Sequence, residues 1–266
     1  MNSQQLLSYH DKGQCWPQAI SSTPGYDINA AYSDALTVRD LRIARGEIPR
    51  GYKIGFTNRT IWTRYNVFGP VWGTVWNTTL TFCSGYQGLS LNGICQPRIE
   101  PEIVFGFKET PKSDATLEDI YKSLGWIAPG FEIVQSHMPD WKFEATDTIA
   151  DGGLHGRLIV GEKSAISSIS NSAYELHELL AKATAALFRD GDQVEVGVGT
   201  NVLDSPLHAL EHLLKELRSC PGSTDVQPGD VVTTGTWTDA YPVKSGESWR
   251  VSFSLPKTSL TVHFED

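Results

Sequence analysis

The strongest constraint on the fold is a series of short β-rich segments, separated by Gly and Pro, in the first half of the chain. Between residues 51 and 107 these segments read GYKIGFT, VFGPVWGTVW, TLTF, LSLNGI and IEPEIVFGF. Runs of β-branched and aromatic residues bounded by turn residues are typical of strands. The tail from 229 to 265 has the same character and alternates apolar with polar residues. We therefore expect a core made mainly of strands.

Helical periodicity is limited to a few other segments. Ser205 and Pro206 form an N-cap and first helical position, and Gly191 is suited to end the helix before it. We expect helices over residues 27–47, 116–127, 172–191 and 205–220. The order of these elements predicts an α+β fold, with an N-terminal helical segment over residues 1–50 and a single catalytic domain over residues 51–266.

The charge balance argues against nucleic acid as a partner. The 266 residues include 31 Asp and Glu against 22 Lys and Arg, which gives a formal net charge of −9. Binding to a phosphate backbone needs a cluster of basic residues, and the sequence has none. The charged fraction of 20% is a little below the usual ~25%. We expect a homo-oligomer, in which part of the surface is buried against other subunits.

The sequence also lacks signals for membranes, secretion and cysteine-based metal sites. No window of about 18 apolar residues occurs, and the first twenty residues have neither a basic start nor an apolar run. The four cysteines are scattered without CxxC spacing. We expect a cytoplasmic protein with no membrane partner, whose cysteines are reduced thiols.

The sharpest chemical feature is a set of three glutamates. Glu100 and Glu102 are two residues apart in an expected strand, so their side chains point to the same face, and Glu132 follows thirty residues later in PGFEIVQSH. Adjacent like charges are unfavourable unless a cation lies between them. Three carboxylates suit Mg²⁺ or Mn²⁺ and leave positions open for substrate. An acidic strand edge exposed to solvent is the alternative interpretation.

Five runs in order carry a family resemblance. They are GYKIGFTN, RIEPEIVF, PGFEIVQSHMPDWKF, DTIAD and GDVVTTGTWTDAYPV, at residues 51–58, 98–105, 129–143, 147–151 and 229–243. In order and spacing they resemble the 2-keto-4-pentenoate hydratase and 4-oxalocrotonate decarboxylase group of the fumarylacetoacetate hydrolase superfamily. The resemblance implies a mixed β-roll core with peripheral helices. It also implies a divalent metal, Mg²⁺ or Mn²⁺, held by Glu100, Glu102 and Glu132.

The resemblance also implies a reaction on a small 2-oxo or 2-enol acid. A bound metal is a Lewis acid that stabilises an enolate. The hydratases add water to a 2-hydroxy-2,4-dienoate, and the decarboxylases reach the same enolate by losing carbon dioxide. Lys53 matches the lysine of the group and is expected to pair with the substrate carboxylate or to exchange a proton. Arg59, in the loop that follows, is a second candidate for binding a carboxylate.

The sequence departs from the group at two places. Hydratases often carry Asp in a Pro-Asp-Tyr/Phe-Gly run, where this chain has Val71 followed by Trp72. An apolar residue there is more like the decarboxylases, whereas Pro101 between the paired glutamates is more like the hydratases. After DTIAD, a serine of the group is replaced by His155. A histidine there has a suitable pKa for general acid–base catalysis, although a loop histidine with a backbone partner is an equal alternative.

Other residues are weaker candidates. Trp72, Lys142 and Asp151 are expected at or near the substrate pocket, and His137 could lie behind it. His208 and His212 are spaced like helical zinc ligands, but the order HALEH differs from HExxH, so we interpret them as a polar helix face.

These observations predict a metal-dependent lyase that hydrates a 2-hydroxy-2,4-dienoate to a 4-hydroxy-2-oxo acid in the breakdown of aromatic or related ring-cleavage products. The alternatives are a decarboxylase of a 2-oxo-3-enedioate and a C–C hydrolase of an acylpyruvate, for which His155 would be the residue to test. A non-enzymatic alternative is an oligomeric scaffold that has lost its chemistry.

Overall fold

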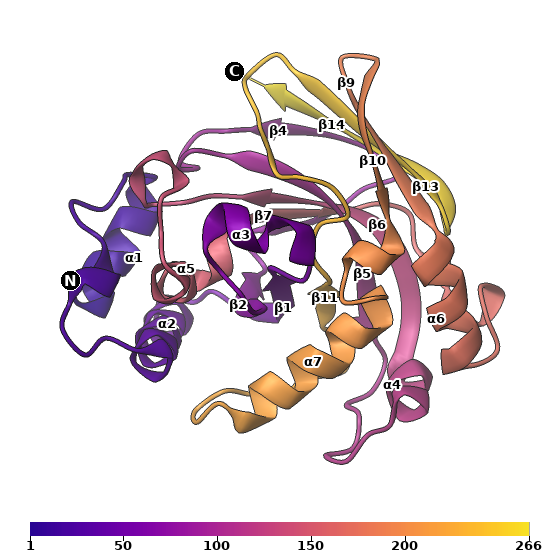
Figure 1. The fold of residues 1–266 in the computed structure, drawn as a ribbon, viewed down its shortest axis with the longest axis horizontal. Coiled ribbons are helices and arrows are strands. Elements are labelled where there is room, and N and C mark those ends of the chain that lie inside the picture. The colour runs from indigo at the N-terminus through magenta and orange to yellow at the C-terminus, as the bar shows by residue number, and fades with distance from the viewer. Residues whose placement is uncertain (266) are drawn as a thin grey trace.

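The computed structural model describes residues 1–265 (Figure 1). Its helices are α1 (Ser3–Lys12), α2 (Ile28–Ala44), α3 (Trp62–Tyr65), α4 (Leu117–Ser123), α5 (Ala145–Ala150), α6 (Ala173–Lys182) and α7 (Pro206–Ser219). Its strands are β1 (Pro49–Gly55), β2 (Val71–Trp76), β3 (Leu80–Phe82), β4 (Tyr86–Ser90), β5 (Arg98–Phe107), β6 (Leu124–Val134), β7 (His155–Val160), β8 (Ser164–Ala165), β9 (Thr184–Arg189), β10 (Asp192–Val198), β11 (Val231–Thr233), β12 (Tyr241–Pro242), β13 (Ser248–Ser254) and β14 (Lys257–Glu265).

Over the described residues these strands form two curved sheets. The larger sheet has nine strands in the order β2-β1-β11-β5-β6-β7-β3, with β12 paired to β5 and β8 paired to β6. The smaller sheet has five strands in the order β10-β9-β13-β14-β4. One large apolar cluster includes residues of both sheets, among them Phe131 of β6 and Phe253 of β13. The strand-rich α+β core predicted from the sequence is therefore confirmed.

The helices lie at the two ends of the larger sheet. In Figure 1, α1, α2 and α5 lie together at one end, and α4, α6 and α7 lie at the other. The N-terminal segment is helical, as expected, and α2 packs against α5, which follows the Glu132 strand. The division of the chain at residue 50 stays a prediction. None of the helices formed by residues 1–265 combines the length and the apolar character that a membrane span requires.

Two of the predicted helices are confirmed almost to the residue. Helix α2 begins after Asp27, whose side chain accepts a hydrogen bond from the Ala30 amide. Helix α7 begins at Pro206 after Ser205, whose hydroxyl accepts from the Leu207 amide. Both caps satisfy an amide that the first helical turn leaves without a partner.

The other two predicted helices are too long. Helix α4 ends at Ser123, and the chain continues from Leu124 as β6. Helix α6 ends at Lys182, and the Ala-rich run after it forms β9, so Gly191 lies in the β9–β10 connection rather than at a helix end. Both segments pair with other strands, β6 with the preceding strand β5 and β9 with the more distant β13. Tertiary pairing overrides local helix propensity here, as it often does.

Candidate active site

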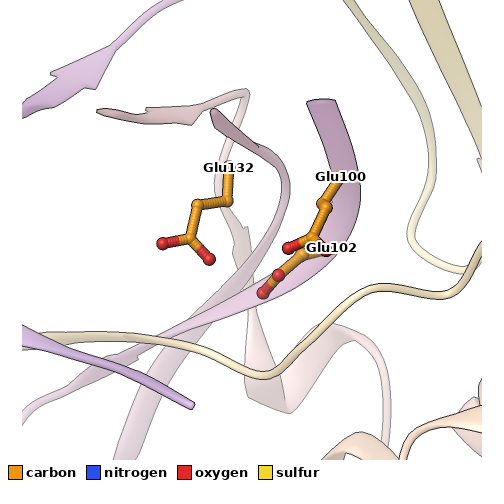
Figure 2. Close-up of side chains that lie close together, drawn as sticks. All are labelled: Glu100, Glu102 and Glu132. Atoms are coloured by element: carbon orange, nitrogen blue, oxygen red, sulfur yellow. The ribbon is translucent and has the colours of Figure 1, made fainter. Parts of the chain in front are cut away.

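Three buried glutamates meet at the centre of the larger sheet. Glu100 and Glu102 lie on the same face of β5, and Glu132 on β6 is directly opposite Glu100 in the antiparallel pair. One carboxylate oxygen of each lies within 4.8 Å of those of the other two. Figure 2 shows the three side chains reaching toward one another from the two strands. Glu102 and Glu132 are fully buried and Glu100 is 9% exposed, so the alternative of a solvent-exposed acidic edge is wrong.

The hydrogen bonds of this triad leave room for a cation. Oε2 of Glu102 accepts from the Gly235 amide at 2.7 Å and from the Thr233 hydroxyl. Oε1 of Glu102 and Oε2 of Glu132 are buried and make no hydrogen bond within the described chain. Buried carboxylate oxygens are costly to leave unpaired. Oε2 of Glu132 has the Lys53 ammonium 3.2 Å away, so the unpaired oxygen of the described chain is Oε1 of Glu102. Three carboxylates with one such oxygen fit a divalent metal ion.

The protonation behaviour of the triad leads to the same conclusion. Burial raises the pKa of Glu100 well above its usual range; the charge of Lys53 opposes this shift, and the charges of Glu102 and Glu132 add to it. Burial and then the charge of Glu132 raise the pKa of Glu102 to about 8. Three buried carboxylates resist ionising together in the absence of a cation. A divalent ion would supply the missing positive charge.

Lys53 on β1 is the basic residue at the triad. Its side chain is buried, and Nζ lies 3.2 Å from Oε2 of Glu132 and donates to the Gly153 carbonyl at 2.7 Å. Burial lowers the pKa of the ammonium, but the three glutamates outweigh it and the net pKa is raised. Lys53 is therefore a protonated ammonium that could pair with an anion or donate a proton.

His155, at the start of β7, touches the triad from the other side. Nδ1 lies 2.8 Å from Oε1 of Glu132, and Nε2 lies 2.8 Å from the Thr79 hydroxyl. Burial lowers the pKa of the imidazole, so the ring is neutral. With Nδ1–H donating to Glu132 and Nε2 accepting from Thr79, both ring nitrogens are occupied. The geometry makes His155 a residue that orients Glu132, and its predicted catalytic role stays a prediction.

A pocket of about 330 Å³ leads to the triad. Its wall includes Lys53 and Glu100 together with aromatic and aliphatic side chains from several loops. The aromatic members are Phe56, Tyr65, Trp141 and Phe143. We call this the metal pocket. No local sequence pattern marks these aromatic residues as part of a pocket. Arg98, two residues before Glu100, supports the wall by stacking on Trp141 and donating to the Tyr65 hydroxyl.

Two predicted substrate-binding residues lie at the surface. The Arg59 side chain is 53% exposed and pairs with Asp204 at 3.0 Å. The Lys142 side chain is 83% exposed and lies 3.9 Å from Asp140. Neither residue lines the metal pocket. Their predicted contact with substrate would need a movement of these loops.

Two other predicted residues are buried but line a different cavity, together with His155. Trp72 stacks on Tyr32, with ring centroids 4.7 Å apart. Asp151 accepts hydrogen bonds from the His137 amide at 2.9 Å and from His137 Nδ1 at 2.5 Å. His137 therefore contacts Asp151 rather than the triad. His208 on α7 lies beside His177, with ring centroids 4.6 Å apart and the rings tilted by 32°.

Comparison with known proteins agrees with this geometry. No family model matches the chain. It is 28% identical over 225 residues to 2-hydroxyhexa-2,4-dienoate hydratase of Comamonas testosteroni, which covers 84% of this chain and 81% of that protein. It is 25% identical over 228 residues to 2-keto-4-pentenoate hydratase of Burkholderia vietnamiensis, covering 85% and 82%. The chain is similar to the 2-keto-4-pentenoate hydratases over most of its length. The resemblance inferred from the five sequence runs is confirmed.

Several solved structures share the fold of this chain. The 4-oxalocrotonate decarboxylase of Pseudomonas putida G7, complexed with magnesium and adipate, matches with a TM-score of 0.84 at 22% identity, over 98% of this chain and 95% of that one. A fumarylacetoacetate hydrolase family protein from Yersinia pestis CO92 matches with a TM-score of 0.59 at 11% identity, over 82% and 93%. The predicted fold of the fumarylacetoacetate hydrolase type is thus confirmed.

Proposed function

We propose that this protein is a metal-dependent hydro-lyase that hydrates a 2-hydroxy-2,4-dienoate to a 4-hydroxy-2-oxo acid in aromatic or ring-cleavage catabolism. The observation that carries the proposal is the buried triad of Glu100, Glu102 and Glu132, in which, among the described residues, Oε1 of Glu102 has no partner and Lys53 is the one ammonium that pairs with the triad. The hydratase relatives support the reaction type. An idle scaffold would retain a buried and unfavourable cluster of carboxylates for no gain.

The three glutamates would hold Mg²⁺ or Mn²⁺, and a bound ion would supply Lewis-acid stabilisation of the enolate. Lys53 is placed to pair with the substrate carboxylate and to hold or donate a proton at Nζ. The aromatic wall of the metal pocket would pack against the diene and exclude bulk water. His155 would keep the Glu132 carboxylate oriented through its Nδ1–H.

Decarboxylation of a 2-oxo-3-enedioate is a second candidate, because the wall near Lys53 carries apolar residues. Leu154 lines the metal pocket, and Val71 pairs with Gly55 at the end of β1. Neither side chain can activate a water molecule. Loss of carbon dioxide needs only stabilisation of the enolate that forms and one proton donor. The similarity to 4-oxalocrotonate decarboxylase favours the same alternative. The C–C hydrolase alternative is less favoured because both nitrogens of His155 are occupied.

We also propose that the protein acts in the cytoplasm as a homo-oligomer, on a small molecule rather than on nucleic acid or a membrane. Its net charge of −9 supports the lack of a nucleic-acid partner. Large apolar side chains at the surface, including Phe68, Tyr86 and Tyr174 at 63%, 60% and 75% exposure, support burial against other subunits. Light scattering on the purified protein would give the number of subunits.

The experiment that tests the function is turnover of 2-hydroxypenta-2,4-dienoate and of 2-oxohex-3-enedioate with Mg²⁺ or Mn²⁺, with carbon dioxide trapped. Loss of the dienoate absorbance without gas supports the hydratase, and gas from the second substrate supports the decarboxylase. We predict that Glu102→Gln lowers turnover and metal affinity by more than about 100-fold, since even residues behind a ligand contribute up to this much. Glu109→Gln, an exposed control, should change neither. Unchanged activity of Glu102→Gln would contradict the metal site.

A further inference from the structure

A second cavity lies between α1, α2 and the edge strand β2, and we call it the helix-side cavity. It shares no lining residue with the metal pocket. Apolar side chains form much of its wall, and a few polar groups complete it. The residues that the argument uses are Trp16, Arg39, Arg42, Trp72, Asp151 and Gly152.

Two buried indoles on this wall lack a hydrogen-bond acceptor. Trp16 is 3% exposed and Trp72 is 4% exposed, and Nε1 of each makes no hydrogen bond within the described chain. Buried N–H groups nearly always have a partner. The indole of Trp62, by comparison, donates to the Phe56 carbonyl at 2.7 Å. Two unpaired donors on one cavity indicate a ligand that brings acceptors.

The charged residues of the cavity also favour an anion. Arg39 is half-buried and donates to the Thr224 hydroxyl at 3.0 Å, and no carboxylate of the described residues lies within ion-pair distance of it. Arg42 pairs with Glu47 at 2.5 Å and stacks on Trp76. The one carboxylate on the wall is Asp151, and His137 occupies both of its oxygens. The cavity therefore offers indole donors and positive charge, and its one carboxylate is already paired.

We propose that the helix-side cavity binds a small monocarboxylate with an apolar body. The carboxylate would accept from the indole N–H groups of Trp16 and Trp72 and face the Arg39 guanidinium, a pairing that Arg geometry suits. The apolar body would contact Leu6, Leu36 and Val38 on the helical wall. None of the residues proposed to hold this ligand touches the glutamate triad. His155 is the link between the two sites, because it lines the helix-side cavity and lies 2.8 Å from Glu132.

The wall between the two cavities is thin. Gly152 lines the helix-side cavity, while the carbonyl of the next residue, Gly153, accepts from Lys53 of the metal pocket. A test must therefore distinguish the two places where a carboxylate could bind. Binding without metal provides this distinction, since a carboxylate in the metal pocket would depend on the ion.

The experiment measures binding of benzoate, phenylacetate and hexanoate by titration calorimetry with the full chain in Mg²⁺. We expect binding of at least one probe, weakened about tenfold by Trp16→Phe or by Trp72→Phe, which each remove one hydrogen bond to a charged group. Arg39→Met, on the half-buried side of α2, should weaken it by a similar factor. Trp126→Phe is the matched control, since Trp126 does not line the cavity, and should leave affinity unchanged.

Two further measurements keep the proposal falsifiable. Circular dichroism checks that the tryptophan variants fold, and Arg39→Met tests the site without altering a buried ring. The titration is repeated with a chelator and with Glu102→Gln, where the proposal expects the same affinity as in Mg²⁺. Affinity that disappears with the metal would place the probe in the metal pocket and overturn the proposal. The absence of binding by all three probes, or equal affinity in all variants, would overturn it as well.

Discussion

At the scale of single residues, the position of Lys53 is the most informative. Burial removes water from the ammonium and lowers its pKa, whereas attraction to the three carboxylates raises it. For Lys53 the attraction is the larger effect, and the pKa is raised. The same ammonium donates to the Gly153 carbonyl, so its position is fixed from two sides. Gly55 makes this possible, because a Cβ there would lie 2.8 Å from Nζ.

We predict that Lys53→Met lowers kcat by about 100-fold or more, the usual effect of losing a positioned proton donor. Mg²⁺ affinity should stay the same or rise, because the variant removes a positive charge next to the triad. Steady-state kinetics and a metal titration measure the two effects separately. Lys108→Met, at an exposed lysine after β5, is the control. A variant that loses metal affinity together with kcat would contradict this separation of roles and mean that Lys53 is needed for the geometry of the ion site.

The residues of the triad could be predicted from the sequence, whereas the wall of the metal pocket could not. Glu100 and Glu102 are two residues apart, which places both side chains on one face of a strand. Glu132 is the third glutamate of the set, and the five sequence runs supported it and added Lys53. Phe56 and Tyr65 lie in the segment between β1 and β2, with Tyr65 at the end of α3, and Trp141 and Phe143 lie in the segment between β6 and α5, about 80 residues away in the chain. Apolar side chains in such segments have no local pattern, so only the fold shows that these two segments meet.

At the scale of elements, β2 and the turn at Gly152–Leu154 fix the back of the metal pocket. A Cβ on Gly73 of β2 would lie 1.9 Å from the Gly152 carbonyl oxygen, so the turn packs directly on the strand. Gly152 and Gly153 both have positive φ, of 64° and 71°, which most other residues disfavour. Because the turn packs so closely on β2, the Gly153 carbonyl that accepts from Lys53 is held in place.

We predict that Gly73→Ala lowers kcat by about 100-fold, because it displaces the turn and the Lys53 partner by a fraction of an ångström or more. Mg²⁺ affinity should change little, since the triad lies on β5 and β6. Gly69→Ala is the matched control, because a Cβ there meets no atom within 4 Å. Kinetics and metal titration of both variants give the comparison, and equal activity of the two would refute the role of this contact.

A second link between elements joins the end of α2 to the β2–β3 turn. Glu47 accepts from Arg42, Arg45 and Thr78. Burial raises the pKa of this carboxyl, but these hydrogen bonds outweigh it and lower the net pKa. A carboxyl whose pKa is lowered in the folded state stabilises the protein at neutral pH and loses this effect as the pH falls through the folded pKa.

Glu47→Gln is therefore expected to lower the free energy of unfolding by about 2 kcal/mol at neutral pH. The difference from the unaltered protein should shrink as the pH falls below about 4, where Glu47 is increasingly protonated in both states. Urea unfolding across this pH range measures it. Glu211→Gln, which breaks an exposed pair with Lys215 on α7, should cost only about 0.5 kcal/mol. A pH-independent difference would show that charge is not the cause.

At the scale of the whole molecule, the metal site lies where several parts of the chain meet. The triad comes from β5 and β6, and the donors to Glu102 come from Thr233 at the end of β11 and from Gly235 just beyond it. Lys53 comes from β1, which pairs with β11. A ligand that binds only this assembled state stabilises the folded protein as a whole.

We predict that Mg²⁺ at about 100 times its Kd raises the Tm by roughly 5–10 °C, as expected for about 2.7 kcal/mol of linkage in a chain of this size. Differential scanning fluorimetry with and without a chelator measures the shift. The Glu102→Gln variant should show little or no shift, whereas Glu109→Gln should behave like the unaltered protein. A shift of equal size in Glu102→Gln would place the stabilising ion elsewhere.

The facing positions of Glu100 and Glu132 have a consequence for how such enzymes diverge. Side chains alternate between faces along a strand, so a slip of one residue between β5 and β6 would turn the acids of one strand away from those of the other. The connection between these strands, which includes α4, can change in length without changing how the two strands pair. Insertions there are compatible with an intact ion site, whereas a single deletion inside either strand would abolish it. Natural variation should therefore accumulate in the connection and be nearly absent from the two facing strands.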